Sequence, residues 1–273
     1  MHCMYNCIPE EYLLPEDQIT KAKEIVSWIG YYKQMGRPPV DAEKVIQAVY
    51  YMARTGVQWN ALPRCFGPSS TVYGAFQRLH DLGFFDNFLI EGLEAYHAEI
   101  GLDLKRKVGD CIHVKSPIGS NEVGPSPVDR RKQGTKRSII TDGNGLLLSC
   151  IIAGGNRNDA KLLNQTLEAI PIQFQSQGKD SIWLDAIYDT NEVRTTLFMH
   201  NIRPQISPNP RRKKIEPVRV IEKGVRWVVE RTHSWINRFR RLFVRYDKCA
   251  EIYLAYVKLA ATTNAFSRLR VSG

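Results

Sequence analysis

Three acidic residues lie where a carboxylate could take part in chemistry. Asp110 falls inside a short apolar segment, residues 108–114, whose alternation predicts a β-strand. A carboxylate in that position costs free energy unless it is paired or binds a cation. Asp185 ends a second apolar segment at 181–185, and Glu230 lies in a later helical segment. Oxygen ligands from three separate elements suit Mg²⁺ or Mn²⁺, and two such ions about 4 Å apart support phosphoryl transfer. Taken one at a time, each acid is better explained as a salt-bridged or exposed carboxylate.

The elements that must position these acids form the second half of the chain. Between the second and third expected strands, Asp142-Gly143-Asn144-Gly145 is a strong hairpin-turn signal, so these two strands should be antiparallel. The strands are expected at 108–114, 136–141, 146–153, 181–185 and 203–206, and the helices at 159–170, 190–200, 223–243 and 251–268. This βββαβαβ order followed by helices predicts a ribonuclease-H-like α/β fold with a mixed sheet. In such a sheet the first strand, the fourth strand and a later helix converge.

The first half of the chain is expected to be helical. Helical spacing of apolar residues predicts four helices, at 16–32, 41–54, 69–82 and 87–100. The third helix follows a helix and a turn, which fits a helix-turn-helix-like arrangement with Tyr73, Gln77 and Arg78 on its exposed face. A plain helical bundle has the same spacing. We therefore predict a helical DNA-binding domain at 1–105 and a ribonuclease-H-like catalytic domain at 106–273, with a flexible, substrate-contacting insertion at 116–135.

Charge favours a polyanionic partner. The 273 residues include 38 Lys and Arg against 28 Asp and Glu, a net charge of +10. Fourteen of these basic residues and only four acids lie between Arg203 and Lys248. A nucleic acid is the commonest partner of such a basic surface. A soluble basic helix without a ligand is the alternative that charge by itself leaves open.

Neither a metal-binding cysteine motif nor a membrane segment is evident. The six cysteines are scattered, and Cys3 and Cys7 have no second Cys or His pair at ligand spacing, so reduced thiols are expected rather than zinc. The N-terminus lacks a basic start followed by an apolar stretch, and no run approaches the roughly 20 apolar residues that span a membrane. We expect a cytoplasmic, nucleoid-associated protein.

Several longer motifs make the sequence resemble a known family. In the first half they are Arg54-Thr55-Gly56-Val57-Gln58-Trp59-Asn60-Ala61-Leu62-Pro63 and Phe66-Gly67-Pro68-Ser69-Ser70-Thr71-Val72-Tyr73. In the second half they include Gly134-Thr135-Lys136-Arg137-Ser138, Ala153-Gly154-Gly155-Asn156-Arg157-Asn158-Asp159 and Arg226-Trp227-Val228-Val229-Glu230-Arg231-Thr232-His233. With these motifs the chain closely resembles, over nearly its whole length, the DDE transposases of bacterial insertion sequences in the IS-four/IS-five superfamily.

The resemblance implies metal-dependent DNA strand cleavage and strand transfer at inverted-repeat ends. Asp110, Asp185 and Glu230 match the family's three acids, and they would serve as both catalytic residues and ligands of Mg²⁺ or Mn²⁺. Arg226 matches the family's arginine one helical turn before the third acid. The expected partners are double-stranded DNA, both transposon ends and target, and further copies of this chain as a homodimer or higher assembly.

A set of basic and histidine residues is expected to contact DNA. Its members are Arg226, Arg231, His233, Arg238, Arg240, Arg241, Lys136, Arg137 and Arg78. His233 could instead face solvent, and His113 could be either a contact near Asp110 or an ordinary strand residue. Asp159 is expected to be a helix N-cap rather than a catalytic acid.

The sequence departs from the family pattern after the second acid. The family usually has Asp-Lys-Gly-Tyr-Asp, whereas this chain has Asp185-Ala186-Ile187-Tyr188-Asp189. The change removes a cation, and Ile187 in place of glycine is expected to restrict the turn after the strand. Two alternatives therefore stay open at this point: a ribonuclease-H-like nuclease without strand transfer, and a catalytically decayed or domesticated DNA-binding transposase remnant.

Overall fold

The computed structural model describes residues 5, 7–33, 38–118, 121–127, 129–175, 178, 180–208 and 227–272. These residues form two compact units, one comprising 1–100 and 236–273 and the other 101–235. The division differs from the domains expected from sequence, because residues 236–273 group with the helical first unit rather than with the sheet. No helix of the described residues is long and apolar enough to cross a membrane.

The first unit is entirely helical in its described parts. Its elements are η1 (Glu10–Tyr12), α1 (Glu16–Trp28), α2 (Ala42–Thr55), η2 (Trp59–Ala61), η3 (Arg64–Phe66), α3 (Ser69–Asp81), α4 (Phe84–Glu99), α8 (Arg240–Phe243) and α9 (Ala250–Ser272). The long helices α4 and α9 pack along each other. A Cβ on Gly92 of α4 would lie 3.0 Å from the Thr262 side chain of α9, so glycine permits this close approach. The local apolar spacing that predicts α9 as a helix carries no information about this long-range partner.

Helix α2 shows how the sequence sets an element's limits. The Asp41 side chain caps its start by accepting a hydrogen bond from the Glu43 backbone N–H. Gly56 ends it with φ of 72°, a left-handed conformation that glycine adopts at little cost. Aromatic rings fill the core around the helices, where Phe76 contacts Phe85 and Tyr256.

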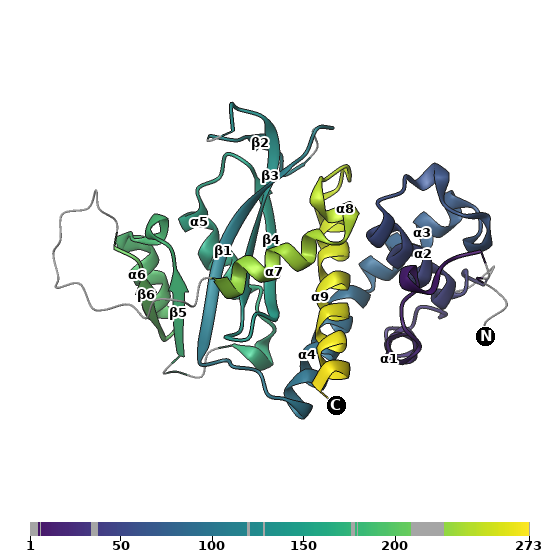
Figure 1. Cartoon of the computed structure of the whole chain (residues 1–273), viewed down its shortest axis with the longest axis horizontal. Coiled ribbons are helices and arrows are strands. Elements are labelled where there is room, and N and C mark those ends of the chain that lie inside the picture. Colours follow the sequence, from purple (N-terminus) through teal and green to yellow (C-terminus); the bar gives the residue numbers. More distant parts are fainter. Residues whose placement is uncertain are drawn as a thin grey trace. The chain divides into compact units, whose positions relative to one another are not determined.

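The second unit is built on a six-stranded mixed sheet (Figure 1). The strands are β1 (Arg106–Lys115), β2 (Gly124–Pro125), β3 (Gln133–Thr141), β4 (Leu147–Gly154), β5 (Asp180–Leu184) and β6 (Ile202–Ile206). Strands β1, β3 and β4 are antiparallel neighbours, whereas β5 and β6 continue the sheet from β1 in parallel. The predicted α/β architecture and antiparallel hairpin are confirmed. Strand β2 lies in the insertion expected at 116–135 and was not anticipated.

Helices cover both faces of this sheet. On one face Ser138 of β3 hydrogen-bonds Thr166 of α5 (Asp159–Glu168), while on the other Arg137 contacts His233 of α7 (Trp227–Asn237). Adjacent strand residues point to opposite faces, so these contacts define an α5 face and an α7 face. The remaining elements are η4 (Ile172–Phe174), η5 (Ala186–Tyr188) and α6 (Asn191–Met199).

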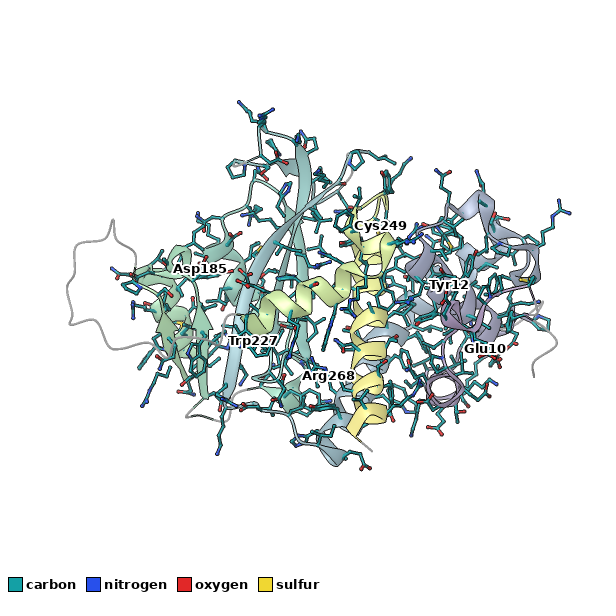
Figure 2. All side chains as sticks on the ribbon, viewed as in Figure 1. Glu10, Tyr12, Asp185, Trp227, Cys249 and Arg268 are labelled. Atoms are coloured by element: carbon teal, nitrogen blue, oxygen red, sulfur yellow. The ribbon has the colours of Figure 1, made fainter. Side chains whose placement is uncertain are left out.

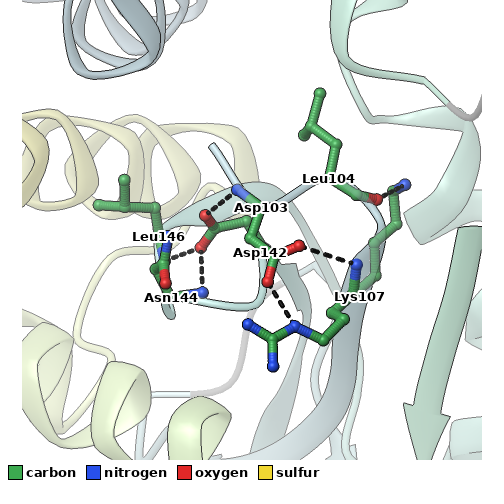
Figure 3. A network of polar contacts seen from close by, with 7 residues as sticks. Asp103, Leu104, Lys107, Asp142, Asn144 and Leu146 are labelled. Carbon is green, nitrogen blue, oxygen red and sulfur yellow. Dashed lines mark hydrogen bonds and ion pairs between the residues drawn. The ribbon is translucent and has the colours of Figure 1, made fainter. Parts of the chain in front are cut away.

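The hairpin between β3 and β4 is closed by one buried carboxylate. Asp142 accepts hydrogen bonds from the backbone N–H groups of Asn144, Leu146 and Asp103 (Figure 3). Asp103 in turn pairs with Arg106 at the start of β1. Asp142 is therefore a structural residue that ties the hairpin to the strand carrying Asp110.

The helix expected at 223–243 is divided. Helix α7 ends at Asn237, and the short α8 begins at Arg240, after Phe239 in an extended conformation. Residues 223–226, including Arg226, lie outside the described residues. Helical spacing predicted the presence of helix here but missed the break, which follows no glycine or proline.

Candidate active site

Asp110 lies on β1 within the sheet. Its backbone is paired with Ile139 of β3, and its side chain is 20% exposed. The His233 imidazole of α7 lies nearby, with its Nε2 3.9 Å from Oδ2 of Asp110. Asp110 thus points to the α7 face and keeps limited access to solvent.

Asp185 immediately follows β5 (Figure 2). The parallel pairing of β1 with β5 ends at Val108 and Trp183, two residues before Asp110 and Asp185. A Cβ on Gly109 would lie 2.7 Å from the Leu184 side chain, so the two strands are still close one residue beyond the last pair. Asp110 and Asp185 therefore follow the paired residues of two adjacent strands at the same spacing.

The turn after Asp185 is regular. The Asp185 carboxylate accepts a hydrogen bond of 2.9 Å from the Ile187 N–H and so caps η5. Ile187 is not among the residues with positive φ, and its side chain is 47% exposed. The expectation that isoleucine would restrict this turn was wrong, because the backbone here adopts a conformation open to any residue.

Tyr188 lies near several carboxylates of the candidate site. Its side chain is buried, and burial raises the pKa of its hydroxyl well above the ordinary value. The negative charges of Asp159, Asp110 and Asp185 raise it further. Tyr188 therefore stays neutral, and Asp159, Asp110 and Asp185 lie near it. Sequence reasoning missed this residue, although its position three residues after Asp185 was visible.

Lys136 supplies a cation to the α5 side of the site. It forms an ion pair with Asp159, and both side chains are mostly buried. The prediction that Asp159 caps α5 was wrong, because Asn158 is the N-cap and accepts from the Ala160 N–H. Burial raises the pKa of the neighbouring Cys111 thiol, and the charge of Asp159 adds to the effect. Lys136 therefore neutralises an acid beside the site instead of facing DNA.

The third predicted acid, Glu230, is exposed on α7. Among the residues that the structure describes, no group of three or more His, Cys, Asp or Glu side chains could hold a metal ion. The carboxylates of Asp110, Asp185 and Glu230 are the donors that Mg²⁺ prefers. The donor chemistry thus fits, but metal binding would require the three acids to lie closer together than they do in the described residues.

Several residues predicted to contact DNA are committed to the interior of their own unit. Arg137 is fully buried, and His233, a residue of α7, is 4% exposed. Arg231 donates to the Asn144 carbonyl and lies over the rings of Trp227 and Trp235. The predictions for Arg137 and His233 were wrong, since groups enclosed in this way present no surface to a duplex. Arg231 is only half-buried, and its contact with DNA stays a prediction.

The same correction applies to Arg241 in the helical unit, which is buried between the Val57 carbonyl and Asp247. Arg78 donates two hydrogen bonds to the Tyr31 carbonyl but is only half-buried, and its contact with DNA stays a prediction. Arg238 and Arg240 are exposed and remain available to a partner. Charge count along the sequence cannot separate these two groups.

His113 is an ordinary strand residue by its surroundings. It lies on β1 opposite Lys136, on the α5 face, and its ring covers Gly134. A Cβ on Gly134 would lie 2.2 Å from that ring, so only glycine fits beneath it. Burial lowers the pKa of His113.

Five of the six cysteines lie in the part of the chain that the structure describes. Cys7, Cys65, Cys111, Cys150 and Cys249 form no disulfide there. The sulfur atoms of Cys7 and Cys65 lie 3.2 Å apart, a proximity that their separation in sequence did not indicate. Cys3 lies outside the described residues.

Comparisons with known proteins assign the chain to a family. Residues 14–89 match a family model for a transposase of the IS4/5 family (DUF4096), and residues 117–264, more than half of the chain, match the model named Transposase DDE domain. A transposase assigned to insertion sequence element IS402 of Burkholderia cepacia is 35% identical over 157 residues, which cover 56% of this chain and 72% of that protein.

Solved structures were also found. The Mos1 transposase paired-end complex with left transposon end is 15% identical, with 84% of this chain and 78% of that chain covered and a TM-score of 0.28. A pre-cleavage Mos1 transpososome gives 15% identity, coverage of 85% and 80%, and a TM-score of 0.28. On the two family models and the IS402 relative, the chain belongs to the DDE transposases of insertion sequences, in the IS4/5 family.

Proposed function

We propose that this chain cuts DNA at the inverted-repeat ends of an insertion sequence and joins those ends to target DNA. Asp110, Asp185 and Glu230 are the proposed catalytic acids, with Mg²⁺ or Mn²⁺ as the cofactor. The observation that carries the proposal is the parallel pairing of β1 with β5, whose last pair, Val108 with Trp183, lies two residues before Asp110 and Asp185. Family membership supports the same assignment.

In this proposal, the protein's residues prepare a site for phosphate chemistry. The two aspartates would hold divalent cations, and Glu230 would complete the ligand set from α7. A bound divalent cation would activate the attacking oxygen and stabilise the leaving oxygen. The Lys136–Asp159 ion pair neutralises one carboxylate on the α5 side, and neutral Tyr188 adds a buried hydroxyl near Asp110 and Asp185.

DNA is the proposed partner of both domains that the sequence predicts. The helical residues 1–105 would bind transposon ends, and 106–273 would carry the chemistry, with homodimers or larger assemblies joining two ends. Exposed Arg238 and Arg240 are suitable phosphate contacts. We retain Arg226 as a proposed phosphate contact on the basis of its position in the family motif, outside the described residues.

The regular turn at Ala186-Ile187 bears on the decayed-remnant alternative. Asp185 caps this turn, and Ile187 shows no left-handed strain, so the substitution leaves no steric defect beside the acid. We therefore favour an active enzyme.

The test is cleavage of a labelled duplex carrying the inverted repeats that flank the coding sequence. Asp110→Asn, Asp185→Asn and Glu230→Gln should each abolish Mg²⁺-dependent cleavage, because each removes a charged ligand. Circular dichroism should show an unchanged fold. The exposed Glu192→Gln of α6 is a matched control and should cleave normally. Near-normal cleavage by any of the three variants would remove that residue from the site.

A further inference from the structure

Two thiols that are far apart in the sequence meet in the helical unit. The sulfur of Cys7 lies 3.2 Å from the sulfur of Cys65, although 58 positions separate the two residues. Cys7 is exposed, and Cys65 is partly buried. A disulfide needs an S–S distance of about 2.05 Å, so the two sulfur atoms would have to approach each other by only about 1 Å. The two thiols are therefore placed where a covalent bond can join them.

Contacts on both sides of the pair hold the sulfur atoms near each other. The Ile8 N–H donates a hydrogen bond of 2.7 Å to the Tyr5 carbonyl, which closes a turn that includes Cys7. Ile8 is buried, and the Tyr5 ring lies 5.4 Å from the ring of Phe66, the residue that follows Cys65. Phe66 is itself fully buried. The proximity of the two thiols thus rests on packing beside each of them.

The two thiols have different surroundings. Burial raises the pKa of the Cys65 thiol to about 11, with the neighbouring Cys7 as the second cause. Cys65 is therefore protonated at pH 7, whereas Cys7 is open to a dissolved oxidant. Oxidants react first with thiols that are exposed, so Cys7 should react first, and Cys65 should react second through its small thiolate fraction.

We propose that Cys7 and Cys65 form a redox modification site, which closes reversibly into a disulfide when a peroxide is present. The Cys7 thiolate attacks hydrogen peroxide, an S–O bond forms, the O–O bond breaks, and the product is a sulfenic acid. The Cys65 thiolate then attacks that sulfur, forming the S–S bond and breaking the S–O bond. In sum, the two thiols lose two protons and two electrons, and one hydrogen peroxide becomes two waters. A thiol reductant reverses the change.

The disulfide would close a loop that contains α1 and α2. Constraining a long loop removes conformations from the unfolded chain, so the bond should stabilise the helical unit. The three proposed catalytic acids belong to the other compact unit. The modification would therefore act on the helical unit, and it does not depend on the proposed chemistry of the acids.

The first test maps the cysteines of the full-length chain after exposure to hydrogen peroxide at pH 7. Peptide mass spectrometry without reductant should find Cys7 joined to Cys65 within one chain, and dithiothreitol should remove the link. Cys249, whose thiol hydrogen-bonds to the Glu251 carboxylate, is the matched control and should form no such link. Cys7 joined mainly to Cys3 or to a second chain would overturn the proposal, and so would a Cys7–Cys65 link that forms no faster than other cysteine pairings.

Single variants in a Cys3→Ser background assign the two roles. In Cys65→Ser, the sulfenic acid on Cys7 loses the thiol that attacks it, so dimedone should label Cys7 about tenfold more than in Cys3→Ser alone. Cys7→Ser should leave Cys65 unlabelled under the same conditions. Equal labelling of Cys7 with and without Cys65 would refute the pairing.

A second measurement tests the effect on the helical unit. The oxidised protein should unfold at a temperature about 5 °C or more above that of the reduced protein. Cys7→Ser should show no such rise after the same treatment, and circular dichroism of the reduced variant verifies that it is folded. A linked protein that unfolds at the same temperature as its reduced form would contradict the stabilising effect.

Discussion

Two pairs of adjacent basic residues, one in each compact unit, are used in opposite ways. Lys136 and Arg137 on β3 are both enclosed, and they point to opposite faces of the sheet, towards Asp159 and His233. In α8, Arg240 is exposed while Arg241 is buried. The four residues contribute equally to the net charge, yet only Arg240 is available on the surface.

The difference follows from how side-chain directions repeat along a strand and along a helix. Strand neighbours alternate across a sheet, so a sheet covered on both faces buries both members of the pair. Helix neighbours are about 100° apart, so one can face the core while the other faces water. A net charge of +10 therefore overstates the basic surface offered to DNA, because several cations neutralise or support buried groups.

The largest effect is expected at Arg241. Its guanidinium donates to the Val57 carbonyl at 3.1 Å and to Asp247 at 2.6 Å, and it lies over the Tyr256 ring. Arg241→Ala leaves the buried Asp247 carboxylate without this partner and should lower the free energy of unfolding by about 3–5 kcal/mol. Urea titration followed by fluorescence measures this change.

The matched control is Arg240→Ala. Because Arg240 is exposed, its removal should change the free energy of unfolding by no more than about 0.5 kcal/mol. It should weaken DNA binding for any sequence and reduce the salt slope by about one. Equal stability losses in the two variants would contradict the distinction between the pairs.

A smaller effect is expected at Lys136. Lys136→Met leaves the mostly buried Asp159 without its paired cation and should cost about 1–3 kcal/mol of unfolding free energy. Asp159→Asn should relieve part of that loss in the double variant, with a coupling on the order of 1 kcal/mol. Strictly additive losses in urea unfolding would mean that the pair is independent and that Lys136 serves another group.

The smallest effect is expected at the departure from the family pattern. Ala186→Lys with Ile187→Gly restores the usual pair, but the turn already has unstrained backbone. We expect cleavage within about threefold of the unaltered protein and a stability loss of about 0.5–1 kcal/mol from the added glycine. A large gain in cleavage rate would show instead that the missing lysine limits activity.

Sequence patterns predicted the strands well because their signals are local. The segment 181–185 is short and apolar and ends at Asp185, and β5 spans Asp180–Leu184. The turn at Asp142 is encoded by its own four residues. In contrast, α9 joins the helical unit through packing against α4, a contact that depends on residues far apart in sequence.

The candidate site was predictable only in part. The sequence showed the type and order of the three acids, and it predicted that the first and fourth strands converge. The burial of Arg137 and His233 could not be predicted, because a basic residue in a charged stretch is usually solvated. To predict it, one would have to know that α7 covers that face of the sheet.

The most direct test of the central claim replaces Mg²⁺ with Fe²⁺ and generates hydroxyl radicals with ascorbate and peroxide. If Asp110, Asp185 and Glu230 hold one metal centre, the polypeptide should be cut near all three positions, and excess Mg²⁺ should suppress every cut. Mass spectrometry locates the cuts, and Asp110→Asn should remove them together. Mg²⁺-suppressible cuts confined to other segments, or cuts that persist in Asp110→Asn, would contradict the account.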